Sequence, residues 1–262
     1  MILIYCQQNL WKTFEDYINS IKNHLNFKIT FDLQEMEYKL INNEEDKLIF
    51  IKNIPNNILN QIKDKNNIYL INTEQMTKQI WRNYIFSLPE NVKIIDYSDY
   101  NLSFYKNHFN SQLIEYQYNN NEILNLKKTK DVVFIGTTSN YRSEIINRIK
   151  KNNKIDQIFG WGLDRDKKLF QYKILVNISY NENYKIFESI RCYRCLFNKM
   201  IIISDIKDDS ESIKYKDNII FVKYDEIPNK VNEVLDNYQY YYDKLDLNNI
   251  ENLVSSDKIN LI

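Results

Sequence analysis

Residues 131–142 read DVVFIGTTSNYR. The apolar run from Val132 to Ile135 is typical of a buried strand, and residues 140–151 (NYRSEIINRIKK) have the apolar spacing of a helix. Gly136 follows the strand directly. This order of strand, glycine and helix is typical of a doubly wound α/β sheet, in which ligands bind beyond the carboxyl ends of the strands. The stretch therefore predicts an α/β fold with a ligand-binding loop at residues 136–139.

The chain of 262 residues contains only three glycines, Gly136, Gly160 and Gly162. Asn, Ile, Lys and Tyr are abundant instead, which is typical of an AT-biased genome. Most turns must then use Asn and Asp, which tolerate left-handed backbone angles. The remaining glycines are candidates for positions where a ligand approaches the backbone closely.

The charge balance excludes some partners. Lys plus Arg number 35 and Asp plus Glu number 35, so the net charge is zero. A protein that binds the phosphates of a nucleic acid usually carries a surplus of positive charge, so we expect no nucleic-acid partner. The hydrophobic fraction of 44% indicates a globular chain.

Cysteine usage and the amino terminus indicate the compartment. Three cysteines, Cys6, Cys192 and Cys195, do not make a disulfide framework, which favours a reducing, cytoplasmic location. The first residues, MILIYCQQ, have no basic region and no long apolar core, so they predict a strand and not a signal peptide. The sequence contains no apolar run of about 18 residues, so we expect no membrane span.

Strands and helices alternate along the first half of the chain. The pattern predicts strands at residues 1–6, 27–33, 47–54, 67–72 and 91–98. It predicts helices at residues 9–25, 56–65 and 73–87. The strands are almost continuously apolar, as in parallel sheets that carry helices on both faces.

The same rhythm restarts after a polar segment, residues 119–130 (NNNEILNLKKTK), which we interpret as a hinge. Strands are predicted at residues 130–136, 154–160, 173–180, 200–205 and 217–224. Helices are predicted at residues 140–151, 164–172 and 183–199. The sequence thus predicts two tandem Rossmann-like domains, residues 1–125 and 126–236, followed by a helical tail at residues 237–262.

The loop at residues 136–142 has the chemistry of an anion site. Thr137, Thr138 and Ser139 supply hydroxyl groups, and Arg142 supplies a guanidinium fork that suits phosphate. The helix start adds unpaired N–H groups. The loop is neither GxGxxG nor a Walker loop, which disfavours dinucleotide oxidoreductases and NTPases. The alternative is a tight turn between strand and helix with an exposed Arg142.

A second candidate stretch precedes the strand at residues 200–205. In the predicted helix 183–199 one apolar stripe faces the core, made of Ile186, Ile190, Tyr193 and Phe197. Glu188 lies roughly opposite this stripe, where its carboxylate can accept hydrogen bonds from two adjacent hydroxyl groups such as those of ribose. Arg191 follows at i+3 and can pair with Glu188. The alternative is that Glu188 only complements the dipole of the helix start.

The segments FIGTTSNYR (134–142), FESIR (187–191) and MIIISD (200–205), in this order, resemble the donor domain of a GT-B glycosyltransferase of the group-1 type. The resemblance covers roughly Lys130 to Asp236. The first half of the chain matches the family only in that it is predicted to form the other Rossmann-like domain. It implies a nucleotide-diphosphate sugar as donor on the second domain and a carbohydrate or glycan acceptor that enters from the first. Members of this family usually require no cofactor and no metal.

The resemblance also implies roles for single residues. Glu188 would bind the donor ribose, with Arg191 beside it, and Gly136, Thr137 and Arg142 would lie near the diphosphate. The helix start near Tyr184 and Lys185 would face phosphate. The turn made of Gly160, Trp161 and Gly162 would lie against the base.

One departure from the family concerns catalysis. Retaining members often carry a second Glu eight positions before the ribose Glu, and here that position is Tyr180, with Glu182 nearby. Retaining or inverting stereochemistry thus stays open, and the alternative function is a catalytically inactive GT-B-like binding or scaffold protein. A Rossmann-like regulator outside glycosyl transfer fits FESIR less well.

The residues that would activate the acceptor are not singled out by the sequence. Strand ends of the first domain bring polar side chains to the crevice: Gln7, Gln8, Glu74, Asp96 and Ser98. Among them Glu74 and Asp96 are the candidate bases. Cys192 and Cys195 form one C-x-x-C pair, and His24 and His108 are the only histidines, so we expect buried thiols and no metal site.

Overall fold

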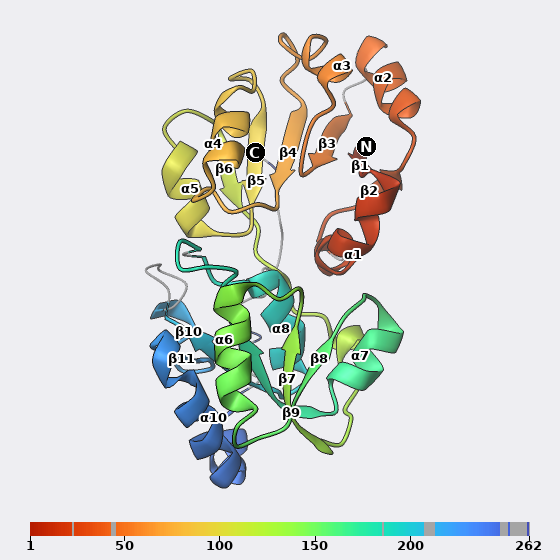
Figure 1. Ribbon diagram of the computed structural model, residues 1–262. Helices are drawn as coiled ribbons and strands as arrows, with labels where there is room; N and C mark the ends of the chain where they lie inside the picture. The colour runs from red at the N-terminus through yellow and green to blue at the C-terminus, as the bar shows by residue number, and fades with distance from the viewer. Residues whose placement is uncertain are drawn as a thin grey trace. The chain divides into compact units, whose positions relative to one another are not determined.

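The computed structural model describes residues 1–22, 24–42, 46–184, 186–206, 213–246, 251 and 261. The chain divides into two compact units (Figure 1). Unit 1 begins at Met1 and runs to Gln117, and unit 2 begins at Tyr118. Leu124, near the end of the predicted first domain, donates its N–H to the Asn198 side chain of unit 2 at 2.8 Å.

Unit 1 has a six-stranded parallel sheet in the order β2-β1-β3-β4-β5-β6. Its strands are β1 (Ile2–Tyr5), β2 (Phe27–Thr30), β3 (Lys47–Ile51), β4 (Ile68–Asn72), β5 (Lys93–Asp96) and β6 (Ser111–Leu113). Its helices are α1 (Gln8–Lys22), α2 (Leu33–Ile41), α3 (Asn56–Leu59), α4 (Gln79–Phe86) and α5 (Asp99–Tyr105).

Unit 2 has a five-stranded parallel sheet in the order β11-β10-β9-β7-β8. Its strands are β7 (Lys130–Ile135), β8 (Ile155–Ile158), β9 (Tyr172–Asn177), β10 (Ile201–Asp205) and β11 (Ile220–Val222). Its helices are α6 (Asn140–Ile149), α7 (Leu163–Leu169), α8 (Ser189–Phe197), α10 (Ile227–Asp236) and α11 (Tyr238–Asp243). Two single 3-10 turns, η1 (Asn120–Glu122) and η2 (Tyr224–Glu226), complete it.

Both faces of each sheet are covered. In unit 2, Val132 and Phe134 of β7 pack in one core cluster with Ile145 of α6 and Val231 of α10. Val133, whose side chain points to the other face, is equally buried, and α8 contacts β9 and β10. The predicted α/β class, with parallel sheets and helices on both faces, is therefore confirmed.

The two sheets share one topology. In each, the first strand lies between the second and the third, so that the strand order reverses beside it. Doubly wound sheets bind ligands at the carboxyl end of this switch point. In unit 2 the switch point lies between β7 and β9, and in unit 1 it lies between β1 and β3.

The helix predicted at residues 183–199 begins later than expected, at Ser189. Asn181 accepts the N–H of Asn183 with its side chain at 3.0 Å, and such local turns compete with a helix. Phe187 accepts the N–H of Ser189 at 2.8 Å and is fully buried, so core packing holds the segment before α8 in a non-helical form. Glu188 is therefore the residue before the helix and not part of its first turn.

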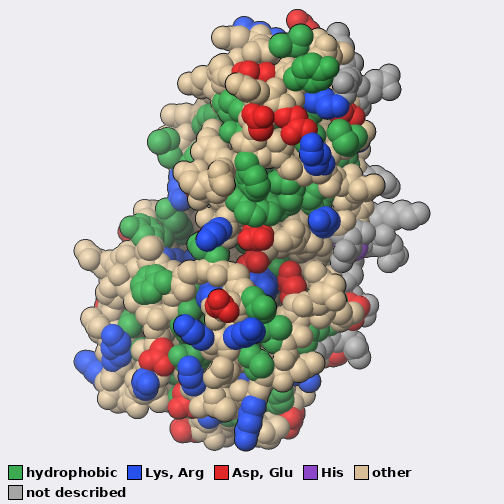
Figure 2. All heavy atoms as spheres, turned by 90° about the vertical axis from the view of Figure 1, so that its right-hand side faces the viewer, with side chains coloured by type: hydrophobic (Ala, Val, Ile, Leu, Met, Phe, Trp, Pro, Cys, Tyr) green, Lys and Arg blue, Asp and Glu red, His purple; other side chains and the backbone are tan. Residues whose placement is uncertain are grey.

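The surface carries charges of both signs. On the face that Figure 2 shows, Lys and Arg side chains lie interspersed with Asp and Glu side chains. This agrees with the zero net charge of the chain. None of the helices in the described ranges combines the length and the apolarity that a membrane span requires.

Candidate functional site

Gly136 stands at the carboxyl end of β7, beside the switch point of unit 2. Its φ of +112° is a conformation that residues with a side chain rarely adopt. Ser139 caps α6 by accepting the N–H of Arg142 at 3.2 Å, and its hydroxyl donates to the Tyr180 carbonyl at 2.6 Å. The Ser139 hydroxyl is thus committed to the local structure, whereas the side chains of Thr137 and Thr138 are exposed.

Arg142 is buried, with 3% of its surface exposed, although the sequence suggests a fork that reaches outward. Its Nε donates to the Ile178 carbonyl at 2.9 Å and its Nη1 to the Thr137 carbonyl at 2.8 Å. The guanidinium lies 5.4 Å from the ring centroids of both Phe134 and Tyr180. Burial, with the charge of Arg191 as the second cause, lowers the pKa of Arg142 to about 10, so it remains a cation at neutral pH.

Arg191 points to the same glycine from the first turn of α8. A Cβ on Gly136 would lie 3.8 Å from Nη1 of Arg142 and 3.8 Å from Nη2 of Arg191. Arg191 donates from Nη1 to the Asn177 side chain at 3.2 Å, and its Nη2 lies 3.9 Å from Oε2 of Glu188. We call Arg142 and Arg191 the Gly136 arginine pair.

The carboxylates nearest the Gly136 arginine pair, Glu188 and Asp205, act on Arg142 through space and do not bond to it within the described ranges. Arg142 binds two neutral carbonyls, and within the described ranges it forms no ion pair with a carboxylate. Arg191 has Glu188 at the outer limit of an ion pair. Two neighbouring cations repel each other, and an anion bound beside Gly136 would relieve that repulsion through charge-assisted hydrogen bonds.

The start of α8 adds one further candidate donor, the hydroxyl of Ser189. Glu188 makes no side-chain bond that caps the helix, although its carbonyl accepts the N–H groups of Arg191 and Cys192 at 3.0 and 3.1 Å. Ser189, the first residue of the helix, has a buried hydroxyl oxygen with no hydrogen-bond partner among the described residues. Sequence reasoning missed Ser189 and Asn177. Asn177 is the last residue of β9, and Ser189 is the first residue of α8. A polar residue at the end of a strand or at the start of a helix is the signal that could have found them.

The turn predicted to contact a base lies at the end of the neighbouring strand. β8 pairs with β7 so that Ile158 lies opposite Ile135, and Gln157 donates to the Gly136 carbonyl at 2.7 Å. Gly160 and Gly162 have φ of +92° and +78°, and Trp161 between them is 49% exposed. The structure therefore brings the turn and the Gly136 loop to the same edge of the sheet.

Two more predicted residues precede α8. Tyr184 lies with its ring centroid 5.8 Å from that of Tyr180, and its carbonyl accepts the Ser179 hydroxyl at 3.1 Å. Lys185 lies outside the described residues. The exposed Glu182 stands in the turn that follows Tyr180.

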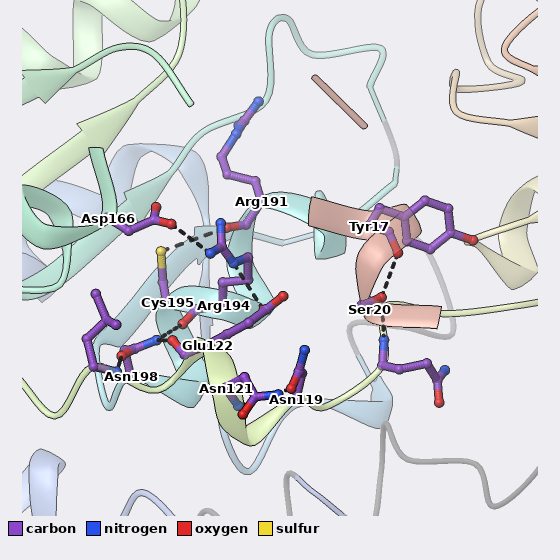
Figure 3. Close-up of polar contacts among 12 residues, drawn as sticks. Tyr17, Ser20, Asn119, Asn121, Glu122, Asp166, Arg191, Arg194, Cys195 and Asn198 are labelled. Atoms are coloured by element: carbon purple, nitrogen blue, oxygen red, sulfur yellow. Dashed lines mark hydrogen bonds and ion pairs between the residues drawn. The ribbon is translucent and has the colours of Figure 1, made fainter. Parts of the chain in front are cut away.

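A second pair of arginines, Arg165 and Arg194, lies in unit 2, and Figure 3 shows Arg194 with its partners. Arg165 of α7 donates to Oδ1 of Asp166 at 2.5 and 2.7 Å, and Arg194 of α8 donates to Oδ2 of the same carboxylate at 2.6 Å. Arg194 also donates from Nε to Glu122 at 3.1 Å. We call Arg165 and Arg194 the Asp166 arginine pair, and its two cations face two carboxylates.

The candidate bases of unit 1 lie in different surroundings. Asp96 is fully buried and accepts hydrogen bonds from Asn72 at 2.6 Å, from Asn101 at 3.0 Å, from the Ser98 N–H at 2.9 Å and from the Tyr105 hydroxyl. Its burial raises the pKa of Asp96 to about 7. The structure thus places Asp96 and Ser98 in the core and not in a crevice.

Glu74 lies in the loop after β4. Its carboxylate pairs with Lys52 at 2.9 Å and with Lys78 at 3.0 Å. Asn72 and Asn101 donate to its carbonyl at 3.0 and 2.9 Å, which fixes the loop and delays the start of α4 to Gln79. Of the other strand-end residues, Gln7 is half-buried and Gln8 is exposed at the start of α1.

The cysteines are buried free thiols, as predicted. Burial raises the pKa of the Cys195 thiol to about 12, so the group is an unreactive thiol at neutral pH. In the part of the chain that the structure describes, His, Cys, Asp and Glu side chains do not gather in a group that could hold a metal ion.

Several solved structures share the architecture of this chain. The DNA-modifying enzyme β-glucosyltransferase is 16% identical, with a TM-score of 0.56 over 97% of this chain and 96% of that one. The T4 phage enzyme BGT in complex with UDP and Mn²⁺ gives 0.52 over 97% and 93%, at 16% identity. TarM gives 0.54 over 80% of this chain and 51% of its own, at 14% identity. At these identities the likeness shows the fold, and the predicted GT-B arrangement of two Rossmann-like domains is confirmed.

No protein-family model matches the chain. Relatives by sequence come from Acanthamoeba polyphaga mimivirus. The uncharacterized protein L140 is 32% identical over 242 residues, which cover 88% of this chain and 78% of L140. The uncharacterized protein R358 is 33% identical over 213 residues, which cover 75% of this chain and 74% of R358. The chain therefore belongs to the same protein family as L140 and R358 of Acanthamoeba polyphaga mimivirus.

Proposed function

We propose that the chain is a glycosyltransferase that takes a sugar from a nucleotide-diphosphate donor held by unit 2 and transfers it to a carbohydrate or glycan acceptor. The observation that carries this proposal is the Gly136 arginine pair. Two guanidinium groups converge on a glycine at the switch point, where ligands of doubly wound sheets bind. A diphosphate brings the negative charge that this pair lacks.

The surroundings of the pair suit the remaining parts of such a donor. The exposed Trp161, between two glycines, offers a flat face to a base. Glu188 is close enough to the pair to accept hydrogen bonds from ribose hydroxyl groups while the diphosphate contacts Arg191. Tyr184 lies in the segment before α8, and with Lys185 it stays a predicted contact of the phosphates.

Catalysis would rest on stabilising the departing nucleoside diphosphate. Arg191 and the buried Arg142 oppose the charge that develops on the leaving phosphate. Glu74 stays the predicted acceptor base, since its carboxylate lies at the carboxyl edge of unit 1 and Asp96 is enclosed. A cytoplasmic location, supported by the free cysteines, belongs to the same proposal.

The comparisons support the choice of donor class. One structural neighbour is in complex with UDP and Mn²⁺, and another has uridine diphosphoglucose as its substrate. We predict that this chain binds and transfers without a metal, and a titration in chelator and then in Mn²⁺ tests that prediction. Loss of activity in chelator that Mn²⁺ restores would contradict it.

The direct test of the function is a binding panel of UDP, GDP and dTDP, followed by an assay of sugar release from the matching donor. We expect one of the three to raise the melting temperature and to bind with a measurable Kd. We expect release of nucleoside diphosphate from the sugar donor, faster when an acceptor sugar is present. Absence of binding by all three would contradict the proposal.

A catalytically inactive GT-B-like binding protein is the second candidate. Two observations favour it, since Tyr180 stands where retaining members often carry Glu and Asp96 is enclosed by hydrogen bonds in the core of unit 1. Such a protein binds the nucleoside diphosphate but does not release it from a sugar donor. The two assays of the panel therefore separate an enzyme from a binding protein.

A further inference from the structure

A chain of buried charges leads from the first residues of unit 2 to the exposed turn at Trp161. Glu122 accepts Nε of Arg194 at 3.1 Å, and Nη2 of Arg194 donates to Asp166 at 2.6 Å. Figure 3 shows Arg194 reaching both carboxylates. Arg165 donates to the other oxygen of Asp166, and its guanidinium lies 5.6 Å from the centroid of the Trp161 ring.

This network is closed and rigid. Asp166 has 1% of its side chain exposed, and the side chains of Arg165 and Arg194 have 9% and 11% exposed. Hydrogen bonds between charged groups are strong at such burial, and two carboxylates balance two guanidiniums. The network therefore needs no anion from outside, unlike the Gly136 arginine pair.

The turn at Trp161 needs a contact with a fixed neighbour to keep one conformation. Gly160 and Gly162 have positive φ, and a Cβ at either position would meet nothing within 4 Å, so the turn itself has little packing. Glycines on both sides leave the backbone of the turn many accessible conformations. Among the described residues, Arg165 supplies the ring contact of Trp161.

We propose that Arg165 is a positioning residue, which Asp166 holds in place and which keeps the Trp161 ring in the orientation that stacks on the base of the bound nucleotide. This inference rests on the proposed function. The two arginine pairs would then have different roles toward a nucleoside diphosphate. The Gly136 pair binds the diphosphate, and the Asp166 pair sets the surface for the base without contact to the ligand.

The test uses the full chain with Trp11→Phe and Trp81→Phe, which leaves Trp161 as the only tryptophan. In this background Arg165→Met removes the guanidinium, while Asp166 keeps its bond to Arg194. Calorimetry then measures the Kd of inorganic diphosphate and of whichever of UDP, GDP and dTDP binds best. Lys168→Met, an exposed change on the same helix, is the matched control.

We expect Arg165→Met to weaken the nucleoside diphosphate about five- to tenfold, since stacking of a base on an aromatic ring is lost in part. Inorganic diphosphate should change less than twofold, and the fluorescence of Trp161 should shift before ligand is added. Lys168→Met should leave all three readouts unchanged. Arg165→Lys keeps a charge beside Asp166 but loses the flat face, so its loss should be intermediate.

Equal losses for both ligands, or no loss for either, would overturn the positioning role and leave the proposed function standing. A wild type that binds inorganic diphosphate but no nucleoside diphosphate would overturn both. If Arg165→Met does not fold, Arg165→Lys provides the test. It should weaken the binding of the nucleoside diphosphate more than the binding of inorganic diphosphate. An unchanged Trp161 fluorescence in a folded variant also counts against the inference.

Discussion

Unit 2 contains two pairs of arginines that share helix α8, yet their charges are balanced in opposite ways. In the Asp166 pair every guanidinium has a carboxylate within 3.1 Å, and the pair is complete without a ligand. In the Gly136 pair the partners are carbonyls, one amide and Glu188 at 3.9 Å. Exposure does not separate the two pairs, because Arg142 is itself buried. The two pairs differ in charge balance, which supports a structural role for the Asp166 pair and the anion site that we propose at the Gly136 pair.

The largest effect is expected from Asp166→Ala. The change leaves the guanidiniums of Arg165 and Arg194 buried without the carboxylate between them, which typically costs about 3–5 kcal/mol. Chemical denaturation of the variant and of the wild type measures the difference in unfolding free energy. Asp131→Ala is the control, because Asp131 makes an exposed pair with Lys173 that should contribute under about 1 kcal/mol. A similar small loss for both variants would break the comparison between the arginine pairs.

The next expected effect is the pH dependence of stability that Asp96 causes. Unlike Asp166, this carboxylate has only neutral hydrogen-bond partners. Burial raises the pKa of Asp96 in the folded chain from its ordinary value of 3.8 to about 7. The fold therefore favours the protonated acid, and this stabilisation is complete below pH 3.8 and is lost as pH rises through 7. Each pKa unit corresponds to about 1.4 kcal/mol, so the full loss is about 4 kcal/mol.

The measurement is the unfolding free energy of the wild type and of Asp96→Asn at several pH values between 4 and 8. The variant has no proton to lose at this position, so its stability should fall less over that range than the stability of the wild type. Parallel curves for the two proteins would contradict the buried, raised pKa of Asp96.

The fold was predictable where the signal is local. The apolar runs of β7 and β10 and the helical spacing of α6 lie in continuous segments, so the sequence predicts them and their order. The start of α8 was predicted wrongly because the Asn181 turn and the burial of Phe187 depend on contacts with other elements. Helix α2, which Asp32 caps, and helix α5 were not predicted at all.

The candidate site was predictable to the same extent. Gly136 and Arg142 belong to one short motif, and the sequence correctly places Gly136 after a strand and Arg142 in the first turn of the helix that follows. The burial of Arg142 was not predictable, since it depends on the rings of Phe134 and Tyr180 and on the Ile178 carbonyl. Asp166 and Arg194 are distant in sequence, so their ion pair appears only in the fold.

A smaller effect is expected from Glu188→Gln, which tests what the carboxylate beside the Gly136 pair does. If Glu188 accepts hydrogen bonds from both ribose hydroxyls, the variant should bind a nucleoside diphosphate about thirtyfold more weakly, or about 2 kcal/mol. Inorganic diphosphate should bind at least as well, because the change removes negative charge near Arg191. Calorimetry with ribose and 2′-deoxyribose nucleotides measures both effects. A wild type that does not distinguish the two sugars would contradict the ribose role.

The central claim is that the Gly136 arginine pair is an anion site, and Arg191→Ala tests it most directly. Arg142 is the poorer probe, because its removal leaves two buried carbonyls without their donor. Arg191 has 23% of its side chain exposed and makes one bond to the buried Asn177 amide and one long ion pair, so Arg191→Ala should lower the unfolding free energy by about 1–3 kcal/mol, with one stranded acceptor in place of two. Calorimetric titration with inorganic diphosphate should show binding to the wild type that is about tenfold weaker in Arg191→Ala and unchanged in the surface control Arg148→Ala. Equal binding by all three proteins, or no binding by the wild type, would contradict the account.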